Sequence, residues 1–368
     1  MSSSSGPYEW HKFLLMITDR CNLVCKMCPI IVNDPKALHR ETMPRELAFQ
    51  AADVAVSKGF KEIEIAGGEA TVIDYFWELL DKMCSSDAEV RLVTNGLMTT
   101  DEQIEIFCSY DNLQVQISVD GTELVHERIR GAKGSYKKTL HTLERLAAAG
   151  CKKMSINTVM QRLNYADLIN VYEALKHLPY LYHAFSLLEP GEAPQECVPD
   201  DKLGDAMAVL REVKRRADQD GNDVILTDEL LTAYYYRMRY PYFTMHPGRG
   251  CTVVQRQVVI FWDGVVVPCF HTAWYFDDLN LNMNDRPLEE ILEAPEYIDA
   301  IEKAIGPNGC TGCSTMCYNW DPDFQRKVMR PNGALKAKRA LALSKEYLRV
   351  NHPGAFDIAK RIKTSIST

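Results

Sequence analysis

Three cysteines near the start of the chain are the residues whose type and spacing best suit chemistry. The segment reads Thr-Asp-Arg-Cys-Asn-Leu-Val-Cys-Lys-Met-Cys-Pro and places thiols at Cys21, Cys25 and Cys28. Three thiolates at this spacing suit three irons of a four-iron cluster, whereas a complete cluster normally uses four cysteines. The missing ligand leaves one iron open, and a catalytic metal site needs such an open position.

A second group of cysteines lies far along the chain. It consists of Cys251, Cys269 and the run Cys310-x2-Cys313-x3-Cys317. Residues 257–261 and 265–267 read as two strands joined by Trp-Asp-Gly, and Asp-Gly is a strong hairpin turn signal. Such a hairpin would bring Cys251 and Cys269 to one end of the ribbon, in an arrangement suited to zinc or an iron-sulfur cluster.

Composition limits the compartment and the partners. The chain has 368 residues and twelve cysteines, and its serine-rich start lacks the features of a secretory signal. We therefore expect a cytoplasmic protein whose close-spaced cysteines bind metal rather than form disulfides. A net charge of -8 with no basic face argues against nucleic acid as a partner, and no apolar stretch is long enough to span a membrane.

Strand and helix patterns alternate through the first half of the chain. Short runs rich in Ile, Val and Leu predict six strands at 13–17, 62–66, 90–94, 113–119, 154–159 and 184–188. Helical patterns lie between them at 44–58, 74–84, 101–108, 135–149 and 165–177. This alternation predicts an α/β fold with a parallel sheet and outer helices. Because six units are fewer than the eight of a closed barrel, we expect a partial, open (β/α)6 barrel.

The Cys-x3-Cys-x2-Cys spacing after a first strand resembles the defining motif of the radical S-adenosylmethionine (SAM) superfamily. The resemblance implies that the open iron binds the amino and carboxylate groups of SAM. It also implies that an electron breaks a carbon-sulfur bond of SAM and generates a 5'-deoxyadenosyl radical. An electron donor such as flavodoxin or ferredoxin is then needed.

Further elements resemble the same family and occur in its order along the barrel. Gly67-Gly68-Glu69 is similar to the element that holds the SAM amino group. Two further segments, Ser118-x-Asp120-Gly and His-x3-Arg130, are similar to the elements in which a serine and an arginine contact the SAM carboxylate. The resemblance covers residues 13 to 190. It also implies cofactor contacts at the third, fifth and sixth strand ends and in the cysteine segment, by Asn95, Asn157, Leu188 and Met27.

The second cysteine group resembles the auxiliary-cluster extension called SPASM in its long form and twitch in its short form. The long form carries seven cysteines, whereas this chain has five in the region. We therefore expect one auxiliary 4Fe-4S cluster held by Cys251, Cys269, Cys310 and Cys313. Cys317 replaces one of these ligands or stays unbound; an unbound Cys317, or Cys197, could then donate a hydrogen atom to a substrate. Asp277 is a candidate general base, as are Asp278, His271 and Tyr275 just beyond Cys269.

These expectations define a domain plan. Residues 1–12 form a flexible start, 13–220 the radical SAM core, 221–247 a linker, 248–330 a hairpin-plus-helix auxiliary-cluster domain and 331–368 a final helix. A fully ligated auxiliary cluster suits electron relay, which favours a radical oxidoreductase.

Because only about a dozen residues precede the first strand, we predict a small-molecule substrate of sugar or cyclitol type, which is oxidised or epimerised. The alternative is a SPASM-type maturase that modifies a ribosomally made peptide. More distant alternatives are a methylating or sulfur-inserting enzyme and a non-catalytic zinc protein.

Overall fold

The computed structural model describes residues 10–28, 30, 41–97, 99–188, 193–225, 253–270 and 279–305. Within them, nine strands form one sheet in the order β7-β6-β5-β4-β3-β2-β1-β8-β9. All neighbouring pairs are parallel except β8 and β9. The strands are β1 (Lys12–Met16), β2 (Glu62–Ala66), β3 (Glu89–Thr94), β4 (Leu113–Ser118), β5 (Met154–Met160), β6 (His183–Leu187), β7 (Val224–Ile225), β8 (Gln257–Ile260) and β9 (Val266–Val267).

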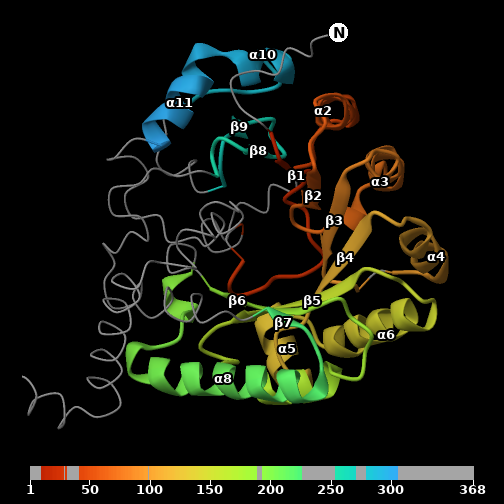
Figure 1. The fold of residues 1–368 in the computed structure, drawn as a ribbon, viewed down its shortest axis with the longest axis vertical. Helices are drawn as coiled ribbons and strands as arrows, with labels where there is room; N and C mark the ends of the chain where they lie inside the picture. The colour runs from red at the N-terminus through yellow and green to blue at the C-terminus, as the bar shows by residue number, and fades with distance from the viewer. Residues whose placement is uncertain are drawn as a thin grey trace, which may run out of the picture.

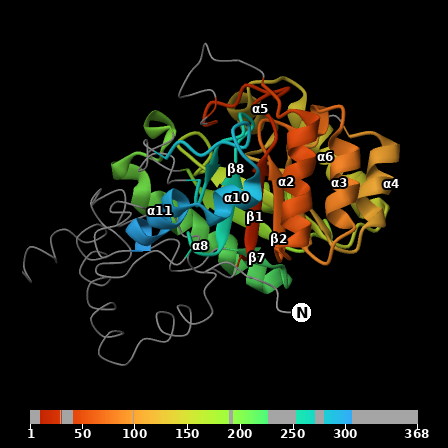
Figure 2. The ribbon, with the colours of Figure 1, turned by 90° about the horizontal axis from the view of Figure 1, so that it is seen from above.

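Helices cover the outer side of this curved sheet, so the predicted open barrel is confirmed. Figure 1 shows α2, α3, α4 and α6 in a row along the convex face, with α8 beside β6 and β7. The barrel helices are α2 (Arg45–Ser57), α3 (Phe76–Cys84), α4 (Asp101–Ser109), α5 (Glu123–Arg130), α6 (Ser135–Ala148), α7 (Leu168–Leu175) and α8 (Leu203–Asp220). Helices α10 (Leu288–Glu293) and α11 (Pro295–Ile305) lie next to β8 and β9 (Figures 1 and 2).

Local sequence explains several helix boundaries. Gly59 and Gly150 directly follow the predicted helices 44–58 and 135–149, and both have positive φ, at 69° and 71°, which side chains rarely tolerate. At the start of α4 the capping residue is Thr100, one residue before the predicted helix 101–108. Thr100 and Gln103 form a capping box, because each side chain accepts a hydrogen bond from the backbone N–H of the other residue.

The predicted hairpin forms β8 and β9, and it does not stand apart from the barrel. Strand β8 pairs in parallel with β1, with Lys12 opposite Gln257 and Leu15 opposite Ile260. Val258, Ile260 and Val266 of the hairpin therefore belong to the same hydrophobic core as Phe13 and Leu15. The short strand β7 falls within residues predicted as a linker and extends the other edge of the sheet.

Helix α5 was not predicted as an element, although its residues were singled out as a motif. It spans only eight residues, and its buried positions are His126, Ile129 and Arg130. Two polar side chains on the buried face hide the apolar periodicity by which such a helix is recognised. None of the helices in the described ranges has both the length and the apolar character needed to cross a bilayer.

Candidate functional site

A cavity opens at the carboxyl ends of the parallel strands. Because those ends meet at one edge of the sheet, the loops that follow β1 to β6 converge there. Side chains of Cys21, Cys25 and Cys28 line the cavity, together with residues at the ends of β2, β3 and β4. The three predicted cluster ligands thus share one cavity with the residues of the later motifs.

The cysteine loop is held between the end of β2 and helix α5. The backbone N–H of Gly68 donates to the carbonyl of Thr18 at 2.7 Å, and that of Glu69 donates to Arg20 at 2.8 Å. On the other side, Lys26 N–H donates to the carbonyl of Ile129 at 3.0 Å. The bonds of Gly68 and Glu69 continue the pairing of β1 with β2 beyond the strands, whereas the bond of Lys26 ties the other end of the loop to α5.

The two glycines of the Gly-Gly-Glu element are required by this close approach. Gly67 has φ 142°, and a Cβ there would lie 2.4 Å from the carbonyl oxygen of Thr18. A Cβ on Gly68 would lie 2.1 Å from the carbonyl oxygen of Arg20. In the structure both glycines therefore admit the backbone of the cysteine loop, and both also line the cavity.

Glu69 joins the ends of β2 and β3 through a buried carboxylate. The residue is 1% exposed and accepts hydrogen bonds from the hydroxyls of Thr71 and Thr94, both at 2.7 Å, and from the backbone N–H of Asn95 at 2.8 Å. Burial raises the pKa of this carboxyl, and the hydrogen bonds partly oppose the shift. The network leaves Glu69 oriented at the cavity wall.

Asn95 reaches from β3 to the cysteine loop. Its Nδ2 donates to the side-chain oxygen of Asn22 at 2.7 Å, and its own side-chain oxygen accepts from Leu97 N–H at 2.9 Å. Asn95 is therefore placed both to fix the loop beside Cys21 and to face the cavity.

Arg130 and Asp120 form a buried ion pair directly behind the second cysteine. Arg130 Nε lies 2.6 Å from Asp120 Oδ2, and Arg130 Nη1 donates to Cys25 Sγ at 3.8 Å. Burial raises the pKa of the Cys25 thiol, whereas the Arg130 charge lowers it. The guanidinium therefore favours the thiolate that a cluster ligand must supply.

A histidine and a strand end hold Asp120 in place. Asp120 N–H donates to His126 Nδ1 at 3.2 Å, and Asp120 Oδ1 accepts from Val159 N–H at 2.9 Å. Burial, and to a smaller extent the positive charge of Arg130, lower the pKa of His126 to about 3. The imidazole is therefore neutral and acts as an acceptor.

Most of the predicted cofactor contacts lie on the cavity wall, and two do not. Asp120 is completely buried beneath Arg130, and Asn157 Oδ1 accepts from Ser186 Oγ at 2.5 Å on the neighbouring strand. The predicted residues that line the cavity are Met27, Gly67, Gly68, Glu69, Asn95, Ser118, Arg130 and Leu188.

The remaining predicted residues divide between buried positions and undescribed ones. Cys197 is 6% exposed, and its thiol contacts the carbonyls of Leu188 and Ala193 at 3.8 and 3.7 Å, behind the cavity wall. Cys269 is buried two residues after β9. The other predicted ligands and candidate catalytic groups lie outside the described residues: Cys251, Cys310, Cys313, Cys317, Asp277, Asp278, His271 and Tyr275.

Sequence reasoning missed the residues that hold the motifs in place. Asn22 and Thr71 anchor Asn95 and Glu69, and Asp19 and Val159 line the cavity. Asn22 lies within the cysteine motif and Thr71 two residues after Glu69, so proximity to a motif was the one available signal. No sequence signal pointed to Val159, because valine is common near strand ends.

The donor set fits an iron-sulfur cluster better than a single ion. Three thiols reach one cavity wall, and Arg130 supports one of them. In the described residues, no three His, Cys, Asp or Glu side chains surround a point where one metal ion could bind. A four-iron cluster binds each cysteine to a different iron, so it spans thiols that one zinc ion would not.

Family models match both cysteine regions. Residues 15–175 match the model described as Radical SAM superfamily, and residues 251–315 match the SPASM model, described as an iron-sulfur cluster-binding domain. Cys251, Cys269, Cys310 and Cys313 fall inside the second match, and Cys317 lies just beyond it.

Two curated relatives are similar over about half of the chain or less. The sporulation killing factor maturation protein SkfB of Bacillus subtilis strain 168 is 29% identical over 196 residues, which cover 53% of this chain and 47% of SkfB. The mycofactocin maturase MftC of Mycobacterium tuberculosis is 35% identical over 153 residues, which cover 41% of this chain and 38% of MftC. The matched regions span less than half of either relative.

Solved structures share the fold at low identity. Streptococcus suis SuiB bound to S-adenosylmethionine has a TM-score of 0.65 and 16% identity, with 82% of this chain and 73% of SuiB covered. SuiB bound to the precursor peptide SuiA has a TM-score of 0.62 and 17% identity, with 79% and 66% covered. The two domains imply SAM, a 4Fe-4S cluster and auxiliary iron-sulfur clusters as cofactors. Both family matches identify the chain as a member of the radical SAM superfamily with a SPASM iron-sulfur cluster-binding domain.

Proposed function

We propose that this enzyme modifies a peptide by radical chemistry started at the cavity beneath the cysteine loop. The proposal depends mainly on one observation: Cys21, Cys25 and Cys28 line the same cavity as Glu69 and Arg130, which lie far from the cysteines in the sequence. When bound there, the cluster and SAM would supply a 5'-deoxyadenosyl radical. The chain's own residues must bind, orient and shield these groups.

Each cavity residue has a role that follows from its contacts. Cys21, Cys25 and Cys28 would ligate the cluster, and Arg130 would stabilise the Cys25 thiolate through its N–H to sulfur contact. Ser118 lies on the same wall, and its hydroxyl would donate a hydrogen bond to the carboxylate of SAM. Glu69, with its carboxylate fixed by three donors, suits the positively charged amino group of SAM.

The apolar part of the wall suits the adenine end of SAM. Met27 and Leu188 line the cavity and belong to one hydrophobic cluster with Leu23 and Cys25. A flat purine gains from contact with such side chains, whereas the charged end of SAM would face Glu69 and Arg130. The wall therefore offers polar groups for the charged end of SAM and apolar side chains for its adenine.

Relatives favour a peptide over the small molecule predicted from the sequence. SkfB and MftC are maturation proteins by name, and SuiB was solved with a precursor peptide. The small-molecule prediction rested on the short segment before β1, which is a weaker argument than these relatives. An auxiliary cluster in the SPASM region would accept or relay the electron of an oxidative modification.

Cofactor chemistry is tested first. The protein is reconstituted anaerobically with iron and sulfide, reduced with dithionite in the presence of SAM, and assayed for 5'-deoxyadenosine by chromatography. A variant with Cys21, Cys25 and Cys28 changed to Ala should make none and should lose about four irons per chain. Equal 5'-deoxyadenosine from the variant would contradict the assignment of these ligands.

Substrate class is tested with isotopes. Short peptides encoded beside the gene are made with deuterated side chains and offered with SAM, and deuterated amino-cyclitols are offered in parallel. The proposal expects deuterium in 5'-deoxyadenosine and a mass change in a peptide. Deuterium transfer from a cyclitol alone, with every peptide unchanged, would restore the small-molecule interpretation.

A further inference from the structure

A basic surface lies on the outside of the cysteine loop. Segments 20–28 and 123–138 carry seven Lys and Arg residues and two acidic residues, Glu123 and Glu127, in a chain whose net charge is -8. Of the seven, Arg130 pairs with Asp120 and Lys137 pairs with Glu123. Arg20, Lys26, Arg128 and Lys133 are exposed. Among the described residues, these four side chains make no ion pair. The positive charge is therefore available to a partner.

The two segments form one continuous surface. Lys26 N–H donates to Ile129 O at 3.0 Å, and a Cβ on Gly131 would lie 2.6 Å from the carbonyl oxygen of Val24. Figure 2 shows α5 beside the red segment that follows β1. We call the exposed residues Val24, Lys26, Leu124, Arg128 and Lys133 the loop–α5 surface.

Apolar residues lie within the same surface. Val24 is 56% exposed and Leu124 is 82% exposed, and Leu124 and Arg128 share one helix face at i and i+4. Exposed apolar side chains beside an excess of basic ones suit a small, transient interface with an acidic protein. Electron-transfer encounters are of this kind.

This surface is the outer side of the cluster loop and not part of the cavity. Val24 and Lys26 flank Cys25, while none of the five residues of the loop–α5 surface lines the cavity. Arg130, one residue before Gly131, contacts Cys25 Sγ. A protein seated here would approach the cluster through one layer of residues, and the substrate would still enter from the cavity side.

We propose that the loop–α5 surface docks an acidic, low-potential electron-transfer protein of the flavodoxin type, which reduces the cluster held by Cys21, Cys25 and Cys28. The inference rests on the proposed function, because it names the partner that starts the same reaction. In each encounter the reduced flavin loses one electron and the cluster gains it. NADPH and flavodoxin reductase replenish the donor. Opposite charge speeds such an encounter and makes it sensitive to salt.

Charge reversal separates docking from catalysis. The variant Arg128→Glu/Lys133→Glu changes the surface and leaves every cavity residue intact, and Lys61→Glu/Arg211→Glu makes the same change in net charge at exposed sites elsewhere. With NADPH, flavodoxin reductase and flavodoxin at low salt, the first variant should make 5'-deoxyadenosine at least about tenfold more slowly than wild type. With dithionite all three proteins should react at equal rates.

Flavodoxin affinity is measured separately by calorimetry, without turnover. The proposal expects a weaker Kd for the surface variant, an unchanged Kd for the control, and a wild-type Kd that weakens with added potassium chloride. Unchanged flavodoxin affinity and rate in the surface variant would overturn it. So would an equal loss with dithionite, or a loss confined to peptide turnover. A wild type that binds flavodoxin at this surface but never cleaves SAM would contradict the proposed function alone.

Discussion

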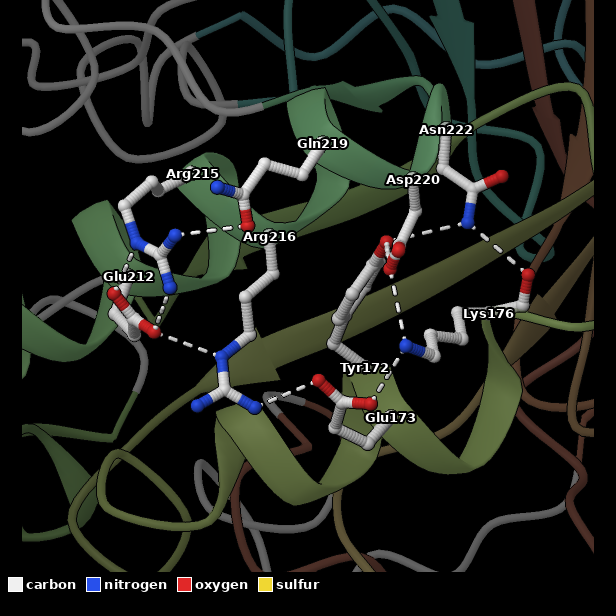
Figure 3. A network of polar contacts seen from close by, with 9 residues as sticks. All are labelled: Tyr172, Glu173, Lys176, Glu212, Arg215, Arg216, Gln219, Asp220 and Asn222. Carbon is white, nitrogen blue, oxygen red and sulfur yellow. Dashed lines mark hydrogen bonds and ion pairs between the residues drawn. The ribbon is translucent and has the colours of Figure 1, made fainter.

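Two polar networks in this protein use the same side-chain chemistry in opposite surroundings. Behind the cavity, Asp120 and Arg130 form a pair that is 0% and 8% exposed. On the outer face, charged residues of α7 and α8 form a chain of contacts (Figure 3). There the Glu212 carboxylate accepts hydrogen bonds from Arg215 and Arg216, and the side chains of these three residues are between 31% and 54% exposed.

The difference lies in redundancy and solvent. In the outer network most groups have a second partner: Arg216 also reaches Glu173, and Asp220 accepts from Tyr172 and Lys176. Arg215 and Arg216 lower the pKa of Glu212 to about 2, yet water would replace either partner. The buried pair has no such substitute, so the cavity network should be sensitive to single changes and the outer one tolerant.

The largest effect is expected from breaking the buried pair. Arg130→Met leaves Asp120 buried without its counter-ion, and we expect a loss of about 3–5 kcal/mol in the free energy of unfolding. Urea unfolding of the cluster-free protein measures it. Asp120→Asn/Arg130→Met, which removes both charges, should cost less than Arg130→Met alone. A single variant within about 1 kcal/mol of wild type would show that the pair is solvated and that the comparison fails.

The next effect concerns the backbone contact between the Gly-Gly-Glu turn and the cysteine loop. Gly67→Ala combines positive φ with a Cβ 2.4 Å from Thr18 O, whereas Gly59→Ala has positive φ but no atom within 4 Å of the Cβ. We expect Gly67→Ala to destabilise the protein by about 1–3 kcal/mol more than Gly59→Ala. Reconstituted iron content should fall with Gly67→Ala alone. Equal unfolding curves for the two variants would show that the loop yields freely.

The third effect is the pH dependence of stability that arises from His183, a buried histidine at the start of β6. Burial lowers the pKa of His183 to about 3, so below its ordinary value of about 6.5 the unfolded chain binds a proton that the folded chain does not. Between about pH 6.5 and pH 3, His183 should therefore contribute a loss of about 1.4 kcal/mol in the free energy of unfolding for each pH unit of acidification.

Unfolding of wild type and His183→Gln at pH 7 and pH 5.5 measures this slope. The variant should lose less stability on acidification, while His141→Gln, at an exposed position, should behave as wild type. Identical acid losses in all three proteins would assign the acid sensitivity to other groups.

The smallest effect is expected on the outer face. Arg216→Met removes contacts with Glu212 and Glu173, but Arg215 still holds Glu212 and Lys176 still holds Glu173. We expect a much smaller loss in the free energy of unfolding than for Arg130→Met, and one that shrinks further in 0.5 M salt. A loss as large as that of Arg130→Met would mean that redundancy does not protect this network.

Prediction from sequence worked best where a motif is local. The alternation of strands and helices indicated the open barrel, and the Gly-Gly-Glu and Thr-Asn-Gly segments were placed at the ends of β2 and β3. It worked less well for α5, whose two buried polar residues hide its periodicity, and for Asn157, whose side chain bonds across to β6. The ligands of the auxiliary cluster remain predictions, because Cys269 is the only one of them among the described residues.

The sequence by itself determined the chemistry: thiols at Cys21, Cys25 and Cys28 are close because few residues separate them, whatever the fold. Tertiary structure decided which groups support them. Arg130 meets Cys25 across 105 residues, and β8 joins the sheet beside β1 although more than 240 residues separate them. Such contacts arise because the sheet curves and its strand ends converge. This curvature depends on the packing of the whole core rather than on any local pattern.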